Sequence, residues 1–249
     1  MASSAVEAIV PSRLQPAAFQ NAGNSCFINS TIAALFANNS VSEYLFANRN
    51  PLSRLSNTFH SSVGAKKYVV RPREYLDPPF YTGRQRDAQE FLSEMLSTDV
   101  DQTAQSKFLG YAQTRLRCLQ CGCARPSAQV DPFALLSLPV IKADLSVIRS
   151  VQEAVDSYFK EEVVFDFTDW VCDDVECPHD RGMGKTLNYI LWPKVLAVQL
   201  MRWSTDLKLG HHVHANDNIT VNGQTYVLRS VVCHAGSGTQ VGHYYTFAK

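Results

Sequence analysis

The segment CFINSTIAALFA at residues 26–37 follows the short polar segment NAGNS at residues 21–25. Its apolar side chains recur at helical spacing, at Phe27, Ile28, Ile32, Leu35 and Phe36. This pattern predicts an amphipathic helix that begins at Cys26. A sulfur at the first position of a helix lies beside backbone N–H groups without intrahelical partners, and these stabilise a thiolate. The sequence is therefore consistent with a reactive thiol; the competing interpretation is an inert buried cysteine, the usual state of a lone cysteine.

A thiol nucleophile also needs a base, and the segment GHY at residues 242–244 offers His243 at the start of a predicted strand. Histidine is the side chain naturally able both to accept and to return a proton near neutral pH. Because Cys26 and His243 are far apart in the sequence, only the fold can bring them together. The alternative interpretation is a core or surface histidine without a chemical role.

The remaining patterns separate a helical first third from a β-rich remainder. Residues 87–97 (DAQEFLSEMLS) have a helical apolar face, and residues 150–160 combine an apolar stripe with a Ser150–Glu153 capping-box pattern. Strands are predicted in five segments: residues 108–117, 128–141, 195–203, 225–234 and 243–248. Helices followed by strands indicate an α+β fold.

Two closely spaced cysteine pairs occur in the second half of the chain: Cys118-x2-Cys121 and Cys172-x4-Cys177. This spacing is the usual outline of a four-thiolate zinc site, with each pair on a β-hairpin turn. Four thiolates leave no open coordination position, so one bound Zn²⁺ would be structural. Cys123 and His179 are further candidate ligands that would be able to replace one of the four. The alternative is a set of free thiols in turns.

A third group of potential ligands consists of His211, His212 and His214. The chain around these histidines is polar and turn-like, with Gly210 before them and Asn216 after them. We therefore interpret this segment as a solvated loop rather than a metal site.

Composition excludes several classes of protein. The 249 residues include 23 Lys and Arg and 23 Asp and Glu, and zero net charge argues against a nucleic-acid-binding partner. No apolar run approaches the roughly 20 residues of a membrane span, and the N-terminal residues do not resemble a secretory signal. The seven cysteines then indicate thiols or metal ligands in a reducing compartment. We expect an intracellular monomer in the cytoplasm or nucleus, with no membrane partner.

Five segments of the chain, in this order, resemble those of the ubiquitin-specific protease family of cysteine deubiquitinases. They are FQNAGNSCFINSTIAAL (19–35), QRDAQEFL (85–92), the two cysteine pairs, PKVLAVQLMRW (193–203) and HAGSGTQVGHY (234–244). The first is similar to the family's cysteine box, the second to its QxDAxEF segment and the last to its histidine box. The fourth resembles its P-x-V-L-x-x-x-L-x-R-F strand, with Trp203 in place of Phe. The cysteine pairs fall where the family carries a zinc site.

This resemblance implies a papain-like α+β fold with a helical thumb, a β-rich palm and zinc-bearing β fingers. The thumb would carry the nucleophilic cysteine, and the palm the histidine. The implied catalytic domain covers residues 19–249, with the fingers inserted at about 108–185 and a loosely structured lead-in at residues 1–18. The family's orienting Asp or Asn would follow His243 beyond Lys249, so we expect the C-terminal end of the domain to be truncated.

The resemblance also assigns roles to individual residues. Cys26 takes the position of the nucleophile, His243 that of the general base, and Asn21 that of the oxyanion-hole amide. Four residues take positions that contact or adjoin the substrate: Asp87, Glu90, Gly242 and Tyr244. The aspartate falls where the family's acid meets the basic C-terminal tail of ubiquitin. The glycine and the tyrosine would line a narrow channel that admits the terminal Gly-Gly pair.

The activity implied by the resemblance is thiol-dependent hydrolysis of the isopeptide bond after the C-terminal glycine of ubiquitin. Ubiquitin or ubiquitinated proteins would be the partners, with one structural Zn²⁺ and no organic cofactor. Two alternatives stay open. One is a ubiquitin-binding module of low or no activity, because the orienting acid is absent. The other is a protease for a ubiquitin-like modifier such as SUMO or NEDD8.

Overall fold

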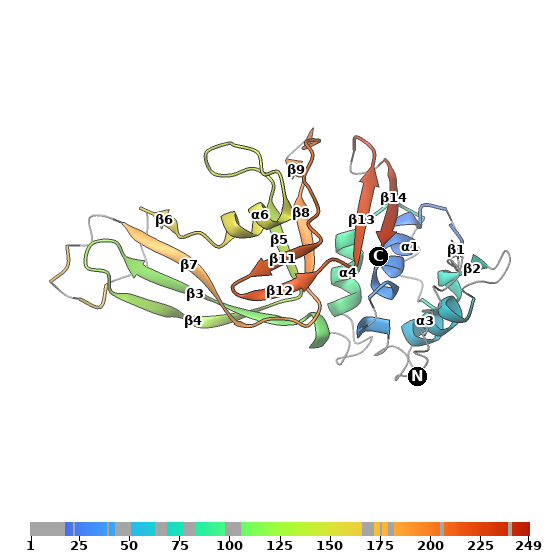
Figure 1. The fold of residues 1–249 in the computed structure, drawn as a ribbon, viewed down its shortest axis with the longest axis horizontal. Coiled ribbons are helices and arrows are strands. Elements are labelled where there is room, and N and C mark those ends of the chain that lie inside the picture. The colour runs from blue at the N-terminus through green and yellow to red at the C-terminus, as the bar shows by residue number, and fades with distance from the viewer. Residues whose placement is uncertain are drawn as a thin grey trace, which may run out of the picture.

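The computed structural model describes residues 18–21, 23–38, 40–42, 51–62, 69–76, 83–97, 106–165, 172–174, 176–178, 182–204, 207–238 and 241–249. These residues form an elongated molecule with helices at one end and a long antiparallel sheet at the other (Figure 1). The predicted lead-in at residues 1–18 lies outside the described residues except for Ala18, so its loose structure stays a prediction.

The helical end contains α1 (Cys26–Phe36), α3 (Pro51–Ser61), α4 (Ala88–Ser97) and the 3-10 helix η1 (Pro72–Glu74). The helix predicted from residue 26 is confirmed, and its apolar stripe forms the core of this end. Phe27 of α1 is fully buried and meets Phe91 of α4 edge to face, with ring centroids 5.8 Å apart. A short parallel pair, β1 (Ala18–Phe19) and β2 (Val69–Val70), packs beside this core through Phe19.

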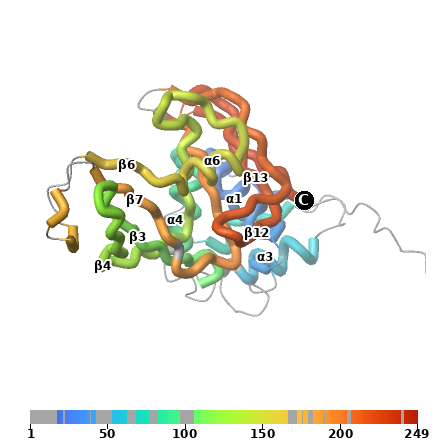
Figure 2. Tube along the Cα trace, turned by 60° about the vertical axis from the view of Figure 1, so that its left-hand side comes forward, coloured from blue at the N-terminus to red at the C-terminus, as the bar shows by residue number. Residues whose placement is uncertain are grey.

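A four-stranded antiparallel sheet projects from the other end, in the order β4-β3-β7-β6 (Figures 1 and 2). Its strands are β3 (Gly110–Cys118), β4 (Ala124–Phe133), β6 (Glu162–Val164) and β7 (Met183–Leu191). The turn between β3 and β4 lies at the far tip of the molecule (Figure 1). The interval expected for the fingers, about 108–185, contains most of this sheet. Within that interval, β5 (Leu135–Pro139) and α6 (Val151–Tyr158) pack instead in the centre.

The centre of the molecule is built on a parallel pair, β5 (Leu135–Pro139) and β8 (Ala197–Met201). The helix α6 (Val151–Tyr158) and the hairpin β11 (Asn218–Val221) and β12 (Gln224–Val227) pack on this pair, with Leu138, Val155 and Val221 buried between them. The predicted cap of α6 is confirmed, because Ser150 Oγ accepts a hydrogen bond of 3.1 Å from the backbone N–H of Glu153.

The strand predicted at residues 128–141 is wrong as a single element, since it is two strands in different sheets. β4 pairs with β3 as far as Phe133, whereas β5 begins at Leu135 and pairs with β8. The chain changes partner at Ala134, which packs against the core of the helical end. The apolar pattern runs through both strands, so it contains no sign of this change.

The last hairpin, β13 (Ser230–Ala235) and β14 (His243–Ala248), packs along α1. Figure 1 shows it between the helices and the strands of the centre. Ser230 Oγ donates to the carbonyl of Ala34, and Thr246 Oγ1 donates to the carbonyl of Ser30, at 3.0 and 2.7 Å. Ser230 pairs with Ala248 of β14, so the first bond places Ala248 near Ala34, and the second places Thr246 near Ser30. The strand β14 therefore runs along α1 in the same direction as the helix. The start of β14, at His243, therefore lies at the N-terminal end of α1.

A small antiparallel pair, β9 (Trp203–Ser204) and β10 (Leu207–Lys208), adjoins the last hairpin. None of the helices in the described ranges has both the length and the apolar character needed to span a bilayer.

Candidate active site and cysteine cluster

The loop before α1 has an uncommon backbone conformation. Gly23 and Asn24 have φ angles of +77° and +48°, in the left-handed region that glycine and asparagine tolerate best. Asn24 Nδ2 donates a 2.9 Å hydrogen bond to the carbonyl of Gly83, which joins the loop to the segment before α4. The helix starts directly after this loop, so buried Cys26 occupies the first helical position, where backbone N–H groups lack intrahelical partners.

The side chain of Asn21 is oriented by Ser25. Asn21 Oδ1 accepts hydrogen bonds from the backbone N–H and the hydroxyl of Ser25, at 3.3 and 3.0 Å. Because these contacts use the carbonyl oxygen of the amide, they leave the Nδ2 group as its donor. Asn21 is exposed in the loop before α1, so a substrate can reach this donor.

His243 is the first residue of β14 and is exposed. Residues of β14 alternate between two faces, and Tyr244 and Thr246 face the helices. His243 precedes Tyr244 at the start of the strand, which lies at the level of the N-terminal end of α1. In the described part of the chain no hydrogen bond joins the Cys26 sulfur to the His243 ring. Hydrogen bonds between catalytic groups often tighten only when a substrate binds.

Tyr244 and Asp87 meet beside Cys26. The Tyr244 hydroxyl donates a 3.0 Å hydrogen bond to Asp87 Oδ2, while Asp87 Oδ1 caps α4 by accepting from the backbone N–H of Gln89 at 2.7 Å. Burial and the negative charge of Asp87 hold the pKa of Tyr244 well above its usual range, so the phenol remains a donor. Glu90 lies exposed on α4, and the structure records no hydrogen bond between it and this group.

Gly242 is packed too closely for any other residue. Its carbonyl accepts a 2.8 Å hydrogen bond from Gln85 Nε2. A Cβ atom at this position would approach the Nε2 atom of His234 to within 2.2 Å and the carbonyl oxygen of Ala235 to within 2.6 Å. The requirement for glycine immediately before His243 is therefore steric.

Two residues of this site were not predicted. Lys208 Nζ donates to His234 Nδ1 at 3.0 Å, and the His234 ring lies 4.7 Å from the ring of Tyr244, centroid to centroid. His234 belongs to the same sequence segment as His243, which is a signal that could have drawn attention to it. Lys208 lies 26 residues before His234, and nothing in its local sequence indicates the contact.

The four predicted cysteine ligands come together at the far end of the sheet. Their sulfurs all lie within 4.8 Å of one another: Cys118, Cys121, Cys172 and Cys177. The Cys118–Cys177 and Cys121–Cys172 sulfur pairs are 3.6 and 3.4 Å apart. In a tetrahedral thiolate site with Zn–S bonds of about 2.3 Å, sulfurs lie about 3.8 Å apart, so this cluster fits such an ion. The group is well separated from Cys26.

The backbone of the β3–β4 turn, which carries Cys121, lowers the pKa of this thiol. A backbone hydrogen bond from Cys123 lowers the pKa of Cys121 to about 7, with smaller contributions in the same direction from the neighbouring thiols. This shift favours the thiolate form of Cys121, which is the form that binds metals, whereas burial raises the pKa of Cys172 in the same cluster. Cys123 itself forms a second group with Cys121 and Asp174 and is not one of the four. His179, the other candidate replacement, lies outside the described residues.

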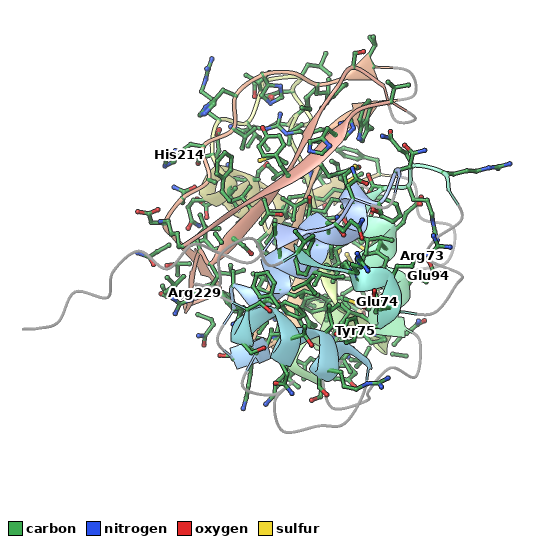
Figure 3. The ribbon with its side chains drawn as sticks, turned by 90° about the vertical axis from the view of Figure 1, so that its right-hand side faces the viewer. Arg73, Glu74, Tyr75, Glu94, His214 and Arg229 are labelled. Atoms are coloured by element: carbon green, nitrogen blue, oxygen red, sulfur yellow. The ribbon has the colours of Figure 1, made fainter. Side chains whose placement is uncertain are left out.

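The histidines at residues 211–214 do not join either group. The only metal-competent groups found in the described ranges are the two that contain Cys121. His214 makes backbone contacts with Arg149 and Val151 at the start of α6. In Figure 3 the labels of His214 and of Glu94 in α4 lie on opposite sides of the view. These observations agree with the interpretation of residues 211–214 as a loop rather than a metal site.

Comparison with known sequences gives one family match over nearly the whole chain. The family profile described as "Ubiquitin carboxyl-terminal hydrolase" matches residues 17–249. Among curated proteins, human ubiquitin carboxyl-terminal hydrolase 17-like protein 11 is 26% identical over 277 aligned residues, covering 94% of this chain and 49% of that protein. The human 17-like protein 6 is also 26% identical, and 66% of it is covered. The chain thus spans about half the length of the first of these relatives.

Two solved structures share this fold. One is the SAGA DUB module of Ubp8, Sgf11, Sus1 and Sgf73 bound to monoubiquitin, with a TM-score of 0.74 and 21% identity. The match covers 98% of this chain and 64% of that one. The other is the Ubp8 module bound to ubiquitin aldehyde, with a TM-score of 0.74, 20% identity and coverage of 97% and 64%. The likeness confirms the expected papain-like α+β fold.

Proposed function

The chain belongs to the ubiquitin carboxyl-terminal hydrolase family, and from this premise we propose that it is a thiol-dependent deubiquitinase. The observation that carries the proposal is the register between β14 and α1. It holds His243 at the helix end where Cys26 sits, although the two residues come from opposite ends of the chain. The Ubp8 structures, solved with monoubiquitin and with ubiquitin aldehyde, support ubiquitin as the substrate.

In the proposed reaction the Cys26 thiolate attacks the carbonyl carbon of the C-terminal glycine of ubiquitin. The Asn21 amide and the backbone N–H groups at the start of α1 stabilise the oxyanion that forms. His243, which has taken the proton of the Cys26 thiol, donates it to the lysine amine as the C–N bond breaks, and this leaves a thioester on Cys26. His243 then takes a proton from water, whose oxygen attacks the thioester carbonyl. The C–S bond breaks, which releases ubiquitin with a free carboxylate and regenerates the Cys26 thiolate.

The entry for the ubiquitin tail is proposed between the start of β14 and the start of α4. Tyr244 and Asp87 already bond to each other there, and Gly242 is held by Gln85. These contacts narrow the space beside Cys26 and favour glycine at the last two positions of the substrate. Asp87 and exposed Glu90 add negative charge, which suits a basic tail.

A ubiquitin with a C-terminal electrophile tests this proposal directly. The wild-type chain is expected to form a covalent adduct, and the Cys26→Ala variant none. Parallel hydrolysis of ubiquitin, SUMO and NEDD8 reporters determines which modifier is the substrate. Labelling no faster than in a denatured control, together with measurable ubiquitin binding, would instead favour the ubiquitin-binding module. Faster cleavage of SUMO or NEDD8 would assign the chemistry to a different modifier.

We further propose that the cysteine cluster binds one Zn²⁺ through Cys118, Cys121, Cys172 and Cys177. The mutual sulfur distances support this assignment. Bound zinc would cross-link the β3–β4 turn to the segment before β7 at the tip of the fingers. With four thiolate ligands it has a structural role only.

Asn21 is expected to contribute strongly to the rate. The Asn21→Ala variant should lose about 10²–10³-fold in kcat, the typical cost of removing one oxyanion donor, with little change in KM. The measurement is steady-state hydrolysis of a ubiquitin reporter. Asn21→Asp is the matched control for the donor, because it keeps an oxygen able to accept from Ser25 but removes the N–H group. Wild-type kcat in either variant would contradict the role of the amide as a donor.

Gly242→Ala is expected to lower kcat by about 10²-fold, because relieving the clash with His234 and Ala235 displaces the adjoining His243 by a fraction of an ångström or more. Overpacking should also cost about 1–3 kcal/mol of stability. Thermal unfolding and reporter hydrolysis measure the two effects. Gly238→Ala in the same turn is the control, since a Cβ there meets no atom within 4 Å. Equal activity of both variants would contradict the steric argument.

A further inference from the structure

Lys208 has an unusual set of partners for a cation. Its Nζ atom lies 3.0 Å from His234 Nδ1, 2.6 Å from the carbonyl oxygen of His234 and 2.9 Å from the carbonyl oxygen of Gly236. It also lies 5.5 Å from the centroid of the Trp203 ring, within cation–π range. Among the described residues no carboxylate forms an ion pair with it. All three donors of the ammonium group are thus directed at one short segment of the chain.

The hydrogen bond from Lys208 also determines which nitrogen of the His234 ring carries the proton. An ammonium group can only donate, so Nδ1 must accept and the ring proton must lie on Nε2. Burial and the charge of Lys208 lower the pKa of His234, while Asp87 opposes this shift, so the ring is neutral at neutral pH. Trp203 and Tyr244 pack against the ring, and its Nε2 atom abuts Gly242.

The segment that Lys208 holds is the base of the turn leading to His243. This turn starts after His234 and ends at Gly242, and Ala235 pairs with His243 across the hairpin. A shift of His234 would therefore move Gly242 and His243 with it. The β9–β10 pair contributes no residue to the reaction proposed above. Its effect on the site would pass through His234, which Lys208 contacts by hydrogen bonds and Trp203 contacts through its ring.

We propose that Lys208 is a positioning residue for the reaction, which ties β10 to His234 and Gly236 at the end of β13 and thereby fixes the location of His243 relative to Cys26. This inference rests on the proposed function, since it concerns the same site. Lys208 touches neither the substrate nor the reacting atoms in this arrangement; it acts through the turn.

Kinetics on three single variants test the inference. Lys208→Met, which keeps the length but removes the donors, is expected to lower kcat for a ubiquitin reporter by about 10–100-fold, because a displacement of about 1 Å costs about 10²-fold. The KM should change less than about twofold, since the surface that binds the body of ubiquitin is intact. Lys208→Arg should recover most of kcat, because a guanidinium also donates several hydrogen bonds. Lys142→Met is the matched control: it removes a lysine that pairs with Glu153 near α6, away from the site.

A second measurement does not depend on activity. Nitrogen-15 spectra of the histidine rings in the full chain at pH 7.5 are expected to show His234 with its proton on Nε2 in the wild type. In Lys208→Met the Nδ1 signal should shift or the tautomers should mix, with the far-UV spectrum unchanged. Wild-type kcat in Lys208→Met, or a loss of kcat that Lys208→Arg does not recover and that tracks the loss of folded protein, would overturn the inference. So would a His234 Nδ1 signal and a tautomer that both stay as they are in the wild type.

The two proposals fail in different ways. If the wild-type chain hydrolyses no ubiquitin reporter, the proposed function is overturned, and the positioning role with it, whatever the spectra show. If the wild-type chain is active and Lys208→Met is equally active, only the positioning role is overturned.

Discussion

Cys26→Ala is expected to reduce ubiquitin hydrolysis by about 10⁶-fold, the scale on which loss of a nucleophile abolishes a covalent mechanism. The physical reason is that no other described thiol lies at a helix N-terminus near the start of β14; the nearest alternative in the chain, Cys233, is in β13. Reporter hydrolysis at high enzyme concentration measures the residual rate. Binding of unmodified ubiquitin should be retained, because alanine removes only the sulfur.

Cys233→Ser serves as the control for this prediction, since it removes a different partly buried thiol and should leave the rate within about twofold. The double variant Cys26→Ala with His243→Ala provides a further check. Groups that act as one unit are not additive, so the double variant should be no slower than Cys26→Ala alone. A Cys26→Ala chain that still hydrolyses the reporter at a measurable fraction of the wild-type rate would exclude this residue as the nucleophile.

Cys118→Ser is expected to reduce bound zinc from one equivalent per chain to well below one. Cys118 is fully buried, and its sulfur lies 3.6 Å from that of Cys177, so serine leaves an incomplete ligand set in a closed site. Structural zinc sites contribute about 10–16 kcal/mol of binding free energy in zinc-finger peptides, which indicates that the fingers become much less stable without the ion. Metal analysis of the purified chain gives the stoichiometry, and hydrogen exchange at the tip of β3 and β7 measures the loosening.

Cys123→Ser is the matched control for the metal site, because it removes a thiol from the same turn but not from the group of four. One equivalent of zinc should remain in this variant. Full zinc retention in Cys118→Ser would contradict the assignment. Loss of zinc in Cys123→Ser instead would show that Cys123 replaces one of the four ligands.

The helices α1, α4 and α6 were predictable because their signals are local, whereas α3 (Pro51–Ser61) was not predicted. The stripe of α1 places Ile28 and Ile32 about one turn apart, and both are buried where the pattern predicts. For α6, the Ser150 cap forms as expected, although the Glu153 carboxylate accepts from the backbone N–H of Arg149 rather than from that of the cap residue. The pairing of strands was less predictable. The single strand predicted at residues 128–141 is two strands that are separated at Ala134, because each of them pairs with a different distant strand.

The candidate site also combines features that the sequence predicted with contacts that only the structure revealed. The spacing within each cysteine pair indicated a metal cluster, and the structure brings all four sulfurs together. The hydrogen bond between Tyr244 and Asp87 joins two segments that the sequence analysis singled out separately. Neither segment by itself indicates that these two side chains contact each other. Lys208 was missed entirely, since its role depends on a contact with His234 that forms only when two hairpins pack side by side.

By itself the sequence determined the helix that starts at Cys26, the capped helix α6, the four cysteines able to converge on one ion, and the family to which the chain belongs. These depend on interactions between residues a few positions apart, or on motifs whose order is visible in the chain. The tertiary structure alone decided which strands pair, how β14 runs along α1, and which side chains surround His234. Such contacts depend on the packing of surfaces distant in sequence, where the free energy comes from excluding water between complementary shapes and leaves no local pattern.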